Sequence, residues 1–260
     1  MLENLPAFLT TWGALVAIIW VRYFIIAGLF YALLWLRPSE KVRGDLLVEA
    51  RPDPAIIRHE VTMSLVSSVI YALPGAVVIE AWKAGGTTLY TSNPTTLLEF
   101  AYIPFSVFIY LFVHDTYFYW THRAMHLPRF FKLTHLTHHR SRRPTPWAAF
   151  SFHPWEAIIS AWPLPLLTFI LPIHTSAVFF LLIFMTYCSV ANHAGWEIIP
   201  RKWLSTVFGR VMITASHHQR HHKDYNANYG LYFRFWDQVC KTDKGLETAK
   251  PLDGLTNARP

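Results

Sequence analysis

Residues 114–139 read HDTYFYWTHRAMHLPRFFKLTHLTHH, an aromatic run that leads into two histidine clusters. His122 and His126 are four residues apart, as are His135 and His139, so each pair would share one face of a helix. His138 comes directly before His139 and would point about 100° away from it. The second cluster therefore directs its imidazoles two ways, as two metal ions a few ångströms apart would require.

The same spacing returns later in the chain. HHQRHH at residues 217–222 again places two histidines, His218 and His222, four residues apart, and NHAGW contains His193. The chain has only two Cys and no CxxC pair, which excludes a disulfide framework and a thiolate zinc site. Imidazole-rich ligation suits iron, zinc, copper or nickel. A structural zinc site closes with four ligands, so this larger set predicts a dinuclear centre.

Other polar residues near the clusters have two possible interpretations. His153 in FHPWE and His217 are further candidates for the metal shell, with a local structural role as the alternative. Asp115 lies seven residues before His122, on nearly the same helix face, where it would orient a histidine ring; a helix-end charge is the alternative. The isolated His59 and His174 we interpret as interfacial or packing residues.

The composition predicts a membrane protein. Hydrophobic residues make up 53% of the 260 residues and charged residues only 15%, against about 25% in soluble domains. Apolar stretches at about residues 8–36, 61–82 and 97–120 are long enough to cross roughly 30 Å of hydrocarbon. The first stretch is preceded by no Lys or Arg, so we interpret it as a retained span rather than a signal peptide. Pro74 and Gly75 interrupt the second.

A later interval, residues 157–190, contains no Asp, Glu, Lys or Arg, and Pro172 and His174 lie near its middle. This pattern favours a tight hairpin of two short spans. The alternative is a re-entrant pair that never fully crosses.

The distribution of positive charge orients these spans. With the N-terminus outside, Lys83 is the one Lys or Arg in an outside loop, and Arg22 is the one inside a span. All other Lys and Arg then lie in the cytoplasm, which explains the net charge of +7 without nucleic acid. Arg22 is expected to snorkel or pair within the bundle; contact with a substrate or lipid headgroup is the alternative.

We therefore predict an all-α integral membrane protein with four to five transmembrane helices, the last two as a short hairpin, and a cytoplasmic helical cap holding the histidines. Residues 1–260 would form a single membrane-embedded domain. Its parts would be three spans (about 1–120), two histidine clusters (121–156), the hairpin (157–190), the distal cluster (191–243) and a polar tail (244–260).

With these motifs assembled, the sequence resembles the membrane fatty acid hydroxylase/sterol desaturase superfamily, whose pattern is HxxxH, HxxHH and a distal HxxHH. FSFHPWEAIISAWPLPL and NYGLYFRFWDQVCKTD resemble segments of its sterol 5-desaturase (lathosterol oxidase) branch. The resemblance covers about residues 55–243. Two departures are the doubled histidine at His217 and His218, which leaves the register of the last cluster open, and the VCKTD ending.

The resemblance implies a non-haem di-iron enzyme that uses dioxygen and two electrons to desaturate or hydroxylate a lipid, either sterol-like or acyl. Zinc is expected to replace iron in some purified samples. The metal ligands that carry over from the family are His122, His126, His135, His138, His139, His218, His221 and His222, and His193 matches a further family histidine.

Two groups of residues suggest how the substrate and the electron donor reach the metal centre. Aromatic residues at the span ends are candidate walls of a substrate site or, alternatively, members of an interfacial belt: Tyr117, Phe118, Trp120, Trp147, Trp155 and Trp162. A basic surface would attract an acidic electron donor such as a ferredoxin or a cytochrome b5-type protein, or would only orient the chain: Arg140, Arg142, Arg143, Arg201 and Lys202.

Two alternatives remain for the function. One is a hydroxylase of fatty acyl, ornithine-lipid or carotenoid substrates. The other is a membrane metal-binding or transport protein, which would place histidines along a path within the spans. A membrane zinc protease would need HExxH, whereas HEVTM at His59 lacks the second histidine.

Overall fold

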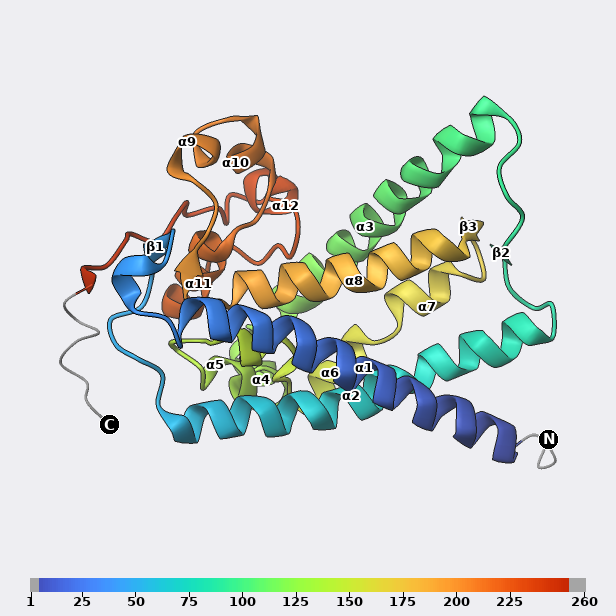
Figure 1. Ribbon diagram of the computed structural model, residues 1–260, viewed down its shortest axis with the longest axis horizontal. Coiled ribbons are helices and arrows are strands. Elements are labelled where there is room, and N and C mark those ends of the chain that lie inside the picture. The colour runs from blue at the N-terminus through green and yellow to red at the C-terminus, as the bar shows by residue number, and fades with distance from the viewer. Residues whose placement is uncertain (1–4, 253–260) are drawn as a thin grey trace.

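A computed structural model describes residues 5–252, and four long helices dominate it (Figure 1). They are α1 (Leu5–Leu34), α2 (Pro54–Lys83), α3 (Leu97–Met125) and α8 (Thr175–Asn192), each long and apolar enough to cross a membrane. The predicted all-α integral membrane fold is confirmed in these terms. The predictions for residues 1–4 and 253–260 lie outside the described residues.

Local signals set where these helices begin. Asp53 precedes α2 and accepts a hydrogen bond from the Ala55 amide at 2.7 Å, with Pro54 in the first turn. Thr96 and Glu99 form a reciprocal capping box at the start of α3. Pro74, expected to interrupt the second span, lies inside α2, which continues through it.

The predicted hairpin at residues 157–190 has one continuous helix, not two. Its first arm is broken into α6 (Pro154–Ser160) and α7 (Pro163–Leu167), because Pro163 and Pro165 begin a new helix after Trp162. The chain then forms β3 (Ile173–His174), which pairs in parallel with β2 (Leu89–Tyr90), before α8 returns. Only the returning arm is long enough to span a membrane.

Short helices gather at one end of the long ones, as Figure 1 shows. Two of them carry histidine clusters: α5 (Leu136–His139) and α11 (Ala215–Asp224). The others are η2 (Ser39–Lys41), α4 (Pro128–Thr134), η3 (Pro146–Phe150), α9 (Arg201–Leu204), α10 (Val207–Val211) and α12 (Phe235–Val239). An antiparallel pair, β1 (Asp45–Leu46) with β4 (Trp196–Glu197), joins the connector after α1 to the segment after α8.

Serines on α2 attach the loop after the second histidine cluster to the bundle. Ser64 donates to the Trp147 carbonyl at 3.0 Å and Ser67 to the Phe152 carbonyl at 3.1 Å. Tyr23 of α1 also donates to the Trp147 carbonyl, and its side chain is fully buried. Since buried carbonyls need partners, these bonds fix the height of the loop on the helices.

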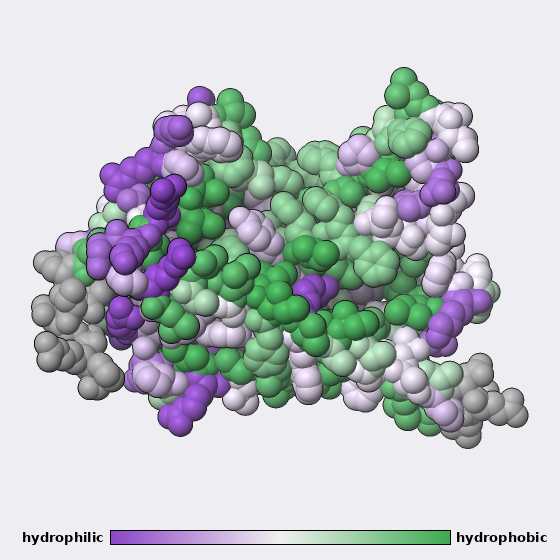
Figure 2. All heavy atoms as spheres, in the orientation of Figure 1, coloured by the Kyte–Doolittle hydropathy of each residue, from purple (hydrophilic) through white to green (hydrophobic). Residues whose placement is uncertain are grey.

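The surface divides into an apolar middle and polar ends. Figure 2 shows hydrophobic side chains across the middle of the visible face and hydrophilic ones at the end where α9 and β1 lie. Ile25 and Phe179 on the long helices are 62% and 68% exposed, as expected of lipid-facing residues. Within residues 5–252, Arg22 forms no ion pair and its Nε has no hydrogen-bond partner, so the expected pairing inside the bundle is not found.

The first part of the polar tail is attached to the cap. The Glu247 amide donates to the Ser216 carbonyl at 3.0 Å, and the Lys250 amide donates to the Leu46 carbonyl at 2.7 Å. The chain thus crosses from α11 to β1 beside the histidines.

Candidate metal centre

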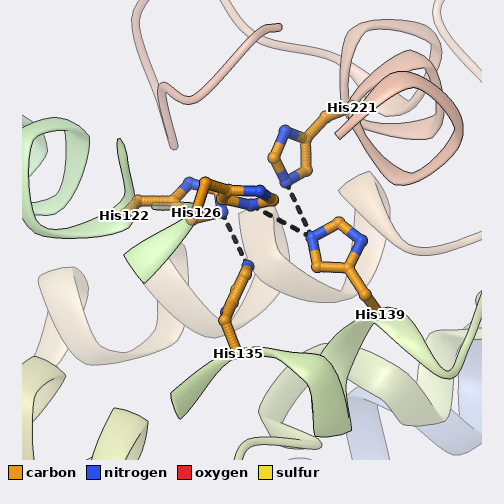
Figure 3. A group of neighbouring side chains, drawn as sticks. All are labelled: His122, His126, His135, His139 and His221. Carbon is orange, nitrogen blue, oxygen red and sulfur yellow. Dashed lines mark hydrogen bonds between the residues drawn. The ribbon is translucent and has the colours of Figure 1, made fainter. Parts of the chain in front are cut away.

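Two groups of histidines lie at the junction of the long helices and the cap. The five-histidine group contains His122, His126, His135, His139 and His221 (Figure 3), and the four-histidine group contains His138, His193, His218 and His222. Within each group, one ring nitrogen from every member lies within 4.8 Å of those of the others. The structure thus brings all nine expected histidines together.

The two groups lie side by side because two pairs of sequence neighbours divide between them. His138 and His139 on α5 belong to different groups, as do His221 and His222 on α11. The ring centroids of His139 and His222 are 4.8 Å apart across the boundary. The two directions expected from the HxxHH spacing are therefore present.

The Nε2 atoms converge closely within each group. In the four-histidine group, Nε2 of His193 lies 3.1 Å from that of His138 and 2.8 Å from that of His218. In the five-histidine group, Nε2 of His139 lies 3.1 Å from that of His221 (Figure 3). Two imidazoles that bind one metal at about 2.1 Å, at right angles, have nitrogens about 3 Å apart.

The outer nitrogens determine which form the rings take. Nδ1 of His193 donates to the Ser189 carbonyl at 2.7 Å, and Nδ1 of His138 donates to the Ser151 carbonyl at 3.3 Å. Because a carbonyl only accepts, each Nδ1 carries the hydrogen and each neutral ring presents a lone pair at Nε2. Two lone pairs that face each other repel, and a shared cation removes that repulsion.

The same arrangement holds in the five-histidine group. Nδ1 of His122 donates to the Tyr229 carbonyl at 2.8 Å and Nδ1 of His221 to the Ala227 carbonyl at 2.7 Å. Carbonyl partners on the outer nitrogen are typical of metal-binding histidines, since they fix the tautomer and the ring orientation.

Burial keeps these rings neutral. Desolvation lowers the pKa of His193 from 6.5 to about 4. Six other rings have a pKa well below the ordinary value of 6.5, first because of desolvation and second because of the neighbouring histidines: His135, His138, His139, His218, His221 and His222. Metal ions bind the neutral imidazole, so the pocket holds its ligands in the binding form.

Sequence reasoning missed Glu156. Its Oε1 accepts a hydrogen bond from Nδ1 of His135 at 2.7 Å, and the side chain is 1% exposed. Desolvation raises the pKa of this carboxyl well above its usual range, so a nearby positive charge would be needed to keep it ionised. The available signal was its position in FHPWE, where it is the last charged residue before the long uncharged interval.

Asp115 does not take the role expected for it. Its Oδ1 accepts from the backbone amides of Leu231 and Tyr232, at 3.0 and 2.7 Å, and its partners include no histidine ring. The carboxylate therefore fixes the segment after α11. Asp237 fixes the same segment by accepting from the amides of Tyr229 and Gly230, and the Tyr229 carbonyl in turn orients His122.

The two further candidates lie outside both groups. Nδ1 of His217 lies 3.2 Å from Oγ1 of Thr214, within the capping box of α11, and Nδ1 of His153 accepts from the Trp155 amide at the start of α6. His174 likewise caps α8. These histidines replace the usual capping side chains, and the last cluster takes the register in which His218 points inward.

The aromatic residues expected to line a substrate site lie in different places in the structure. Phe118 lies beside the five-histidine group, its ring centroid 4.9 Å from that of His122. Phe152, which is not among the expected aromatic residues, has its ring centroid 5.1 Å from that of His138. Trp147 packs against Tyr23, and the remaining four are exposed at the surface: Tyr117, Trp120, Trp155 and Trp162.

Comparison with known proteins gives consistent results. A family model described as fatty acid hydroxylase matches residues 107–242. Human lathosterol oxidase is 31% identical over 170 residues, 63% of this chain and 55% of that protein. A Delta(7)-sterol 5(6)-desaturase of Gibberella zeae is 30% identical over 153 residues, 59% of this chain and 45% of that protein.

A C-4 methylsterol oxidase of Schizosaccharomyces pombe is 30% identical over 147 residues, 55% of this chain and 48% of that protein. The chain spans about half the length of these three relatives. No solved structure matches.

Proposed function

The chain belongs to the fatty acid hydroxylase family, and from this premise we propose that it is a membrane-bound oxidase that uses dioxygen and two electrons to desaturate or hydroxylate a lipid. The observation that carries the proposal is the convergence of nine Nε2-presenting histidines into two adjacent groups. Two neighbouring metal sites made only of imidazoles suit redox chemistry on dioxygen better than a structural zinc site.

The residues present fit a pair of iron ions. The five-histidine group would hold one ion and the four-histidine group the other, and zinc would fit the same nitrogens in a purified sample. When bound, the iron pair supplies the activation of dioxygen and the attack on an unactivated C–H bond.

The protein's own groups orient and protect this centre. Glu156 and the carbonyls of Tyr229, Ser189 and Ala227 hold four of the outer nitrogens, so that the Nε2 of each of these rings points inward: His135, His122, His193 and His221. Phe118 and Phe152 cover the rings of His122 and His138 with apolar surface. Excluding water there protects a reactive centre and favours an apolar substrate.

The substrate we propose is a sterol-like or acyl lipid that enters from the membrane. The names of the relatives, which refer to sterols, support the sterol-like class. The site lies at the ends of α3 and α8, both candidate spans, so a lipid between these helices would meet the histidines. Whether a hydroxyl or a double bond results depends on where the substrate carbon lies relative to the metal.

We further propose that the N-terminus lies outside and the histidine-bearing cap in the cytoplasm, as the positive-inside rule indicates. The chain would then act as one membrane-embedded domain with the five parts expected from the sequence. Electrons would come from a separate donor, a ferredoxin or a cytochrome b5-type protein.

Lipid mass spectrometry of cells with and without the protein tests the function. We expect a lipid that gains one oxygen atom, for hydroxylation, or loses two hydrogen atoms, for desaturation. The matched control is His138→Ala, which removes a member of the four-histidine group and should abolish the change. Unaltered sterols, acyl lipids and carotenoids would refute the proposal.

A further inference from the structure

A pocket of about 480 Å³, lined mainly by charged and polar residues, opens on the cap beside the histidines. Its lining comes from the segment after β1, the loop after α5, the helix α11 and the attached tail. His222 of the four-histidine group forms part of its wall. Within residues 5–252, Nδ1 of His222 has no hydrogen-bond partner, although the residue is fully buried.

Tyr225 connects the same pocket with the five-histidine group. It lines the pocket, and its ring centroid lies 4.6 Å from that of His139. Tyr225 ends α11 with a φ of 57°, a left-handed conformation that is costly for a residue with a bulky side chain. The pocket therefore reaches both histidine groups, one through a ligand ring and one through a single aromatic residue.

The charges around the pocket are unbalanced. Glu247 lies 3.3 Å from Nζ of Lys223 and 3.5 Å from Nζ of Lys250, which also reaches Glu49. Arg142 and Arg143, both exposed on the rim, have no carboxylate partner among the described residues. The acids of the pocket are thus already paired with its lysines, and the two arginines remain free for an external acidic group.

The loop that carries the rim arginines is attached to α11 and α2 by two hydrogen bonds. Gln219 of α11 donates to the Arg142 carbonyl at 3.2 Å, and Thr145 of the same loop donates to the buried Glu60. The other basic residues that the sequence suggested do not line the pocket: Arg140, Arg201 and Lys202. Arg201 is also paired with Asp45 at 2.6 Å.

We propose that this pocket is where an acidic electron-donor protein docks and where electrons enter the metal centre. Arg142 and Arg143 bind carboxylates around the cofactor of the donor, and the cofactor then faces His222 and Tyr225. The inference rests on the proposed function, because only an oxidase needs these electrons.

The electron balance is fixed by the reaction. Two donor molecules are each oxidised by one electron. The two electrons, two protons from water and one dioxygen convert RH into ROH and one water, or –CH2–CH2– into –CH=CH– and two waters.

The test compares two charge reversals in the iron-loaded full chain, reconstituted in bilayer discs of zwitterionic lipid. The probe is a reduced acidic ferredoxin, whose oxidation is followed by stopped-flow absorbance. At low salt, Arg142→Glu with Arg143→Glu should slow oxidation about tenfold or more, and the difference should shrink as salt rises. The matched control, Lys202→Glu, changes an exposed charge outside the pocket and should leave the rate near that of the unaltered chain.

A second arm separates failure of the docking site from failure of the function. Reduced methyl viologen at high salt delivers electrons without protein docking, and the double variant should form lipid product as fast as the unaltered chain. The docking site would be overturned if the double variant oxidised ferredoxin as fast as the unaltered chain. It would also be overturned if the double variant and Lys202→Glu slowed ferredoxin oxidation equally. Absence of lipid product with methyl viologen in every protein would instead overturn the proposed oxidase.

Discussion

His138 and His139 are adjacent in the chain, yet they serve different histidine groups. Nε2 of His138 lies 3.1 Å from Nε2 of His193, whereas Nε2 of His139 lies 3.1 Å from Nε2 of His221. One short helix thereby fixes the spacing of two proposed metal positions, and α11 does the same with His221 and His222. A substitution of either His138 or His139 should therefore weaken metal binding at one of the two positions before the other.

We expect His138→Ala and His139→Ala each to lose about one of two bound iron ions, and the double variant to lose both. Each substitution removes one converging nitrogen from a different group. Metal content per chain, measured by mass spectrometry of the purified protein, checks this. The control is His153→Ala, because His153 caps α6 and lies outside both groups; a loss of iron in this variant would return it to the ligand set.

Glu156→Ala should weaken metal binding by about 10- to 100-fold, the usual effect of removing the carboxylate behind a ligand histidine. The variant frees Nδ1 of His135, which otherwise donates to Glu156 at 2.7 Å. Competition titration with a coloured chelator measures the affinity. Glu156→Gln keeps an acceptor but no charge and should lose less; equal losses in the two variants would mean that the neutral acceptor contributes nothing and that the charge carries the effect.

Removing the metal should lower the thermal stability of the protein. The groups join the ends of α3 and α8 to α5 and α11, so an ion bound only by the folded state stabilises it, by about 2.7 kcal/mol at a hundredfold excess over Kd. Melting curves with and without chelator check this. Chelator should leave the melting temperature of the His138→Ala, His139→Ala double variant unchanged. A shift in melting temperature equal to that of the unaltered protein would contradict the prediction.

Acid should destabilise the fold through His217. Desolvation lowers the pKa of His217 from 6.5 to about 3, so the folded protein resists a proton that the unfolded chain accepts. The unfolding free energy should therefore fall as the pH drops from about 6.5 towards 3, and this loss should be smaller in His217→Gln. Denaturant titrations of metal-free protein at several pH values measure the slope, and an identical slope in both proteins would refute this.

The sequence by itself was sufficient to predict the features that depend only on neighbouring residues in the chain. Hydropathy over about twenty residues predicted the long helices, because a membrane span is set by its own length and composition. The HxxHH spacing predicted two ligand directions, because the helical period fixes the angle between His138 and His139.

What depends on distant contacts was decided only by the tertiary structure. Glu156 meets His135 across 21 residues, and Asp115 meets the backbone of Tyr232 across 117. The choice of His218 over His217 likewise follows from where α11 packs against His193, 25 residues away. Helical periodicity carries no information about such partners, because a hydrogen bond between remote segments exists only once packing has brought both into one buried place.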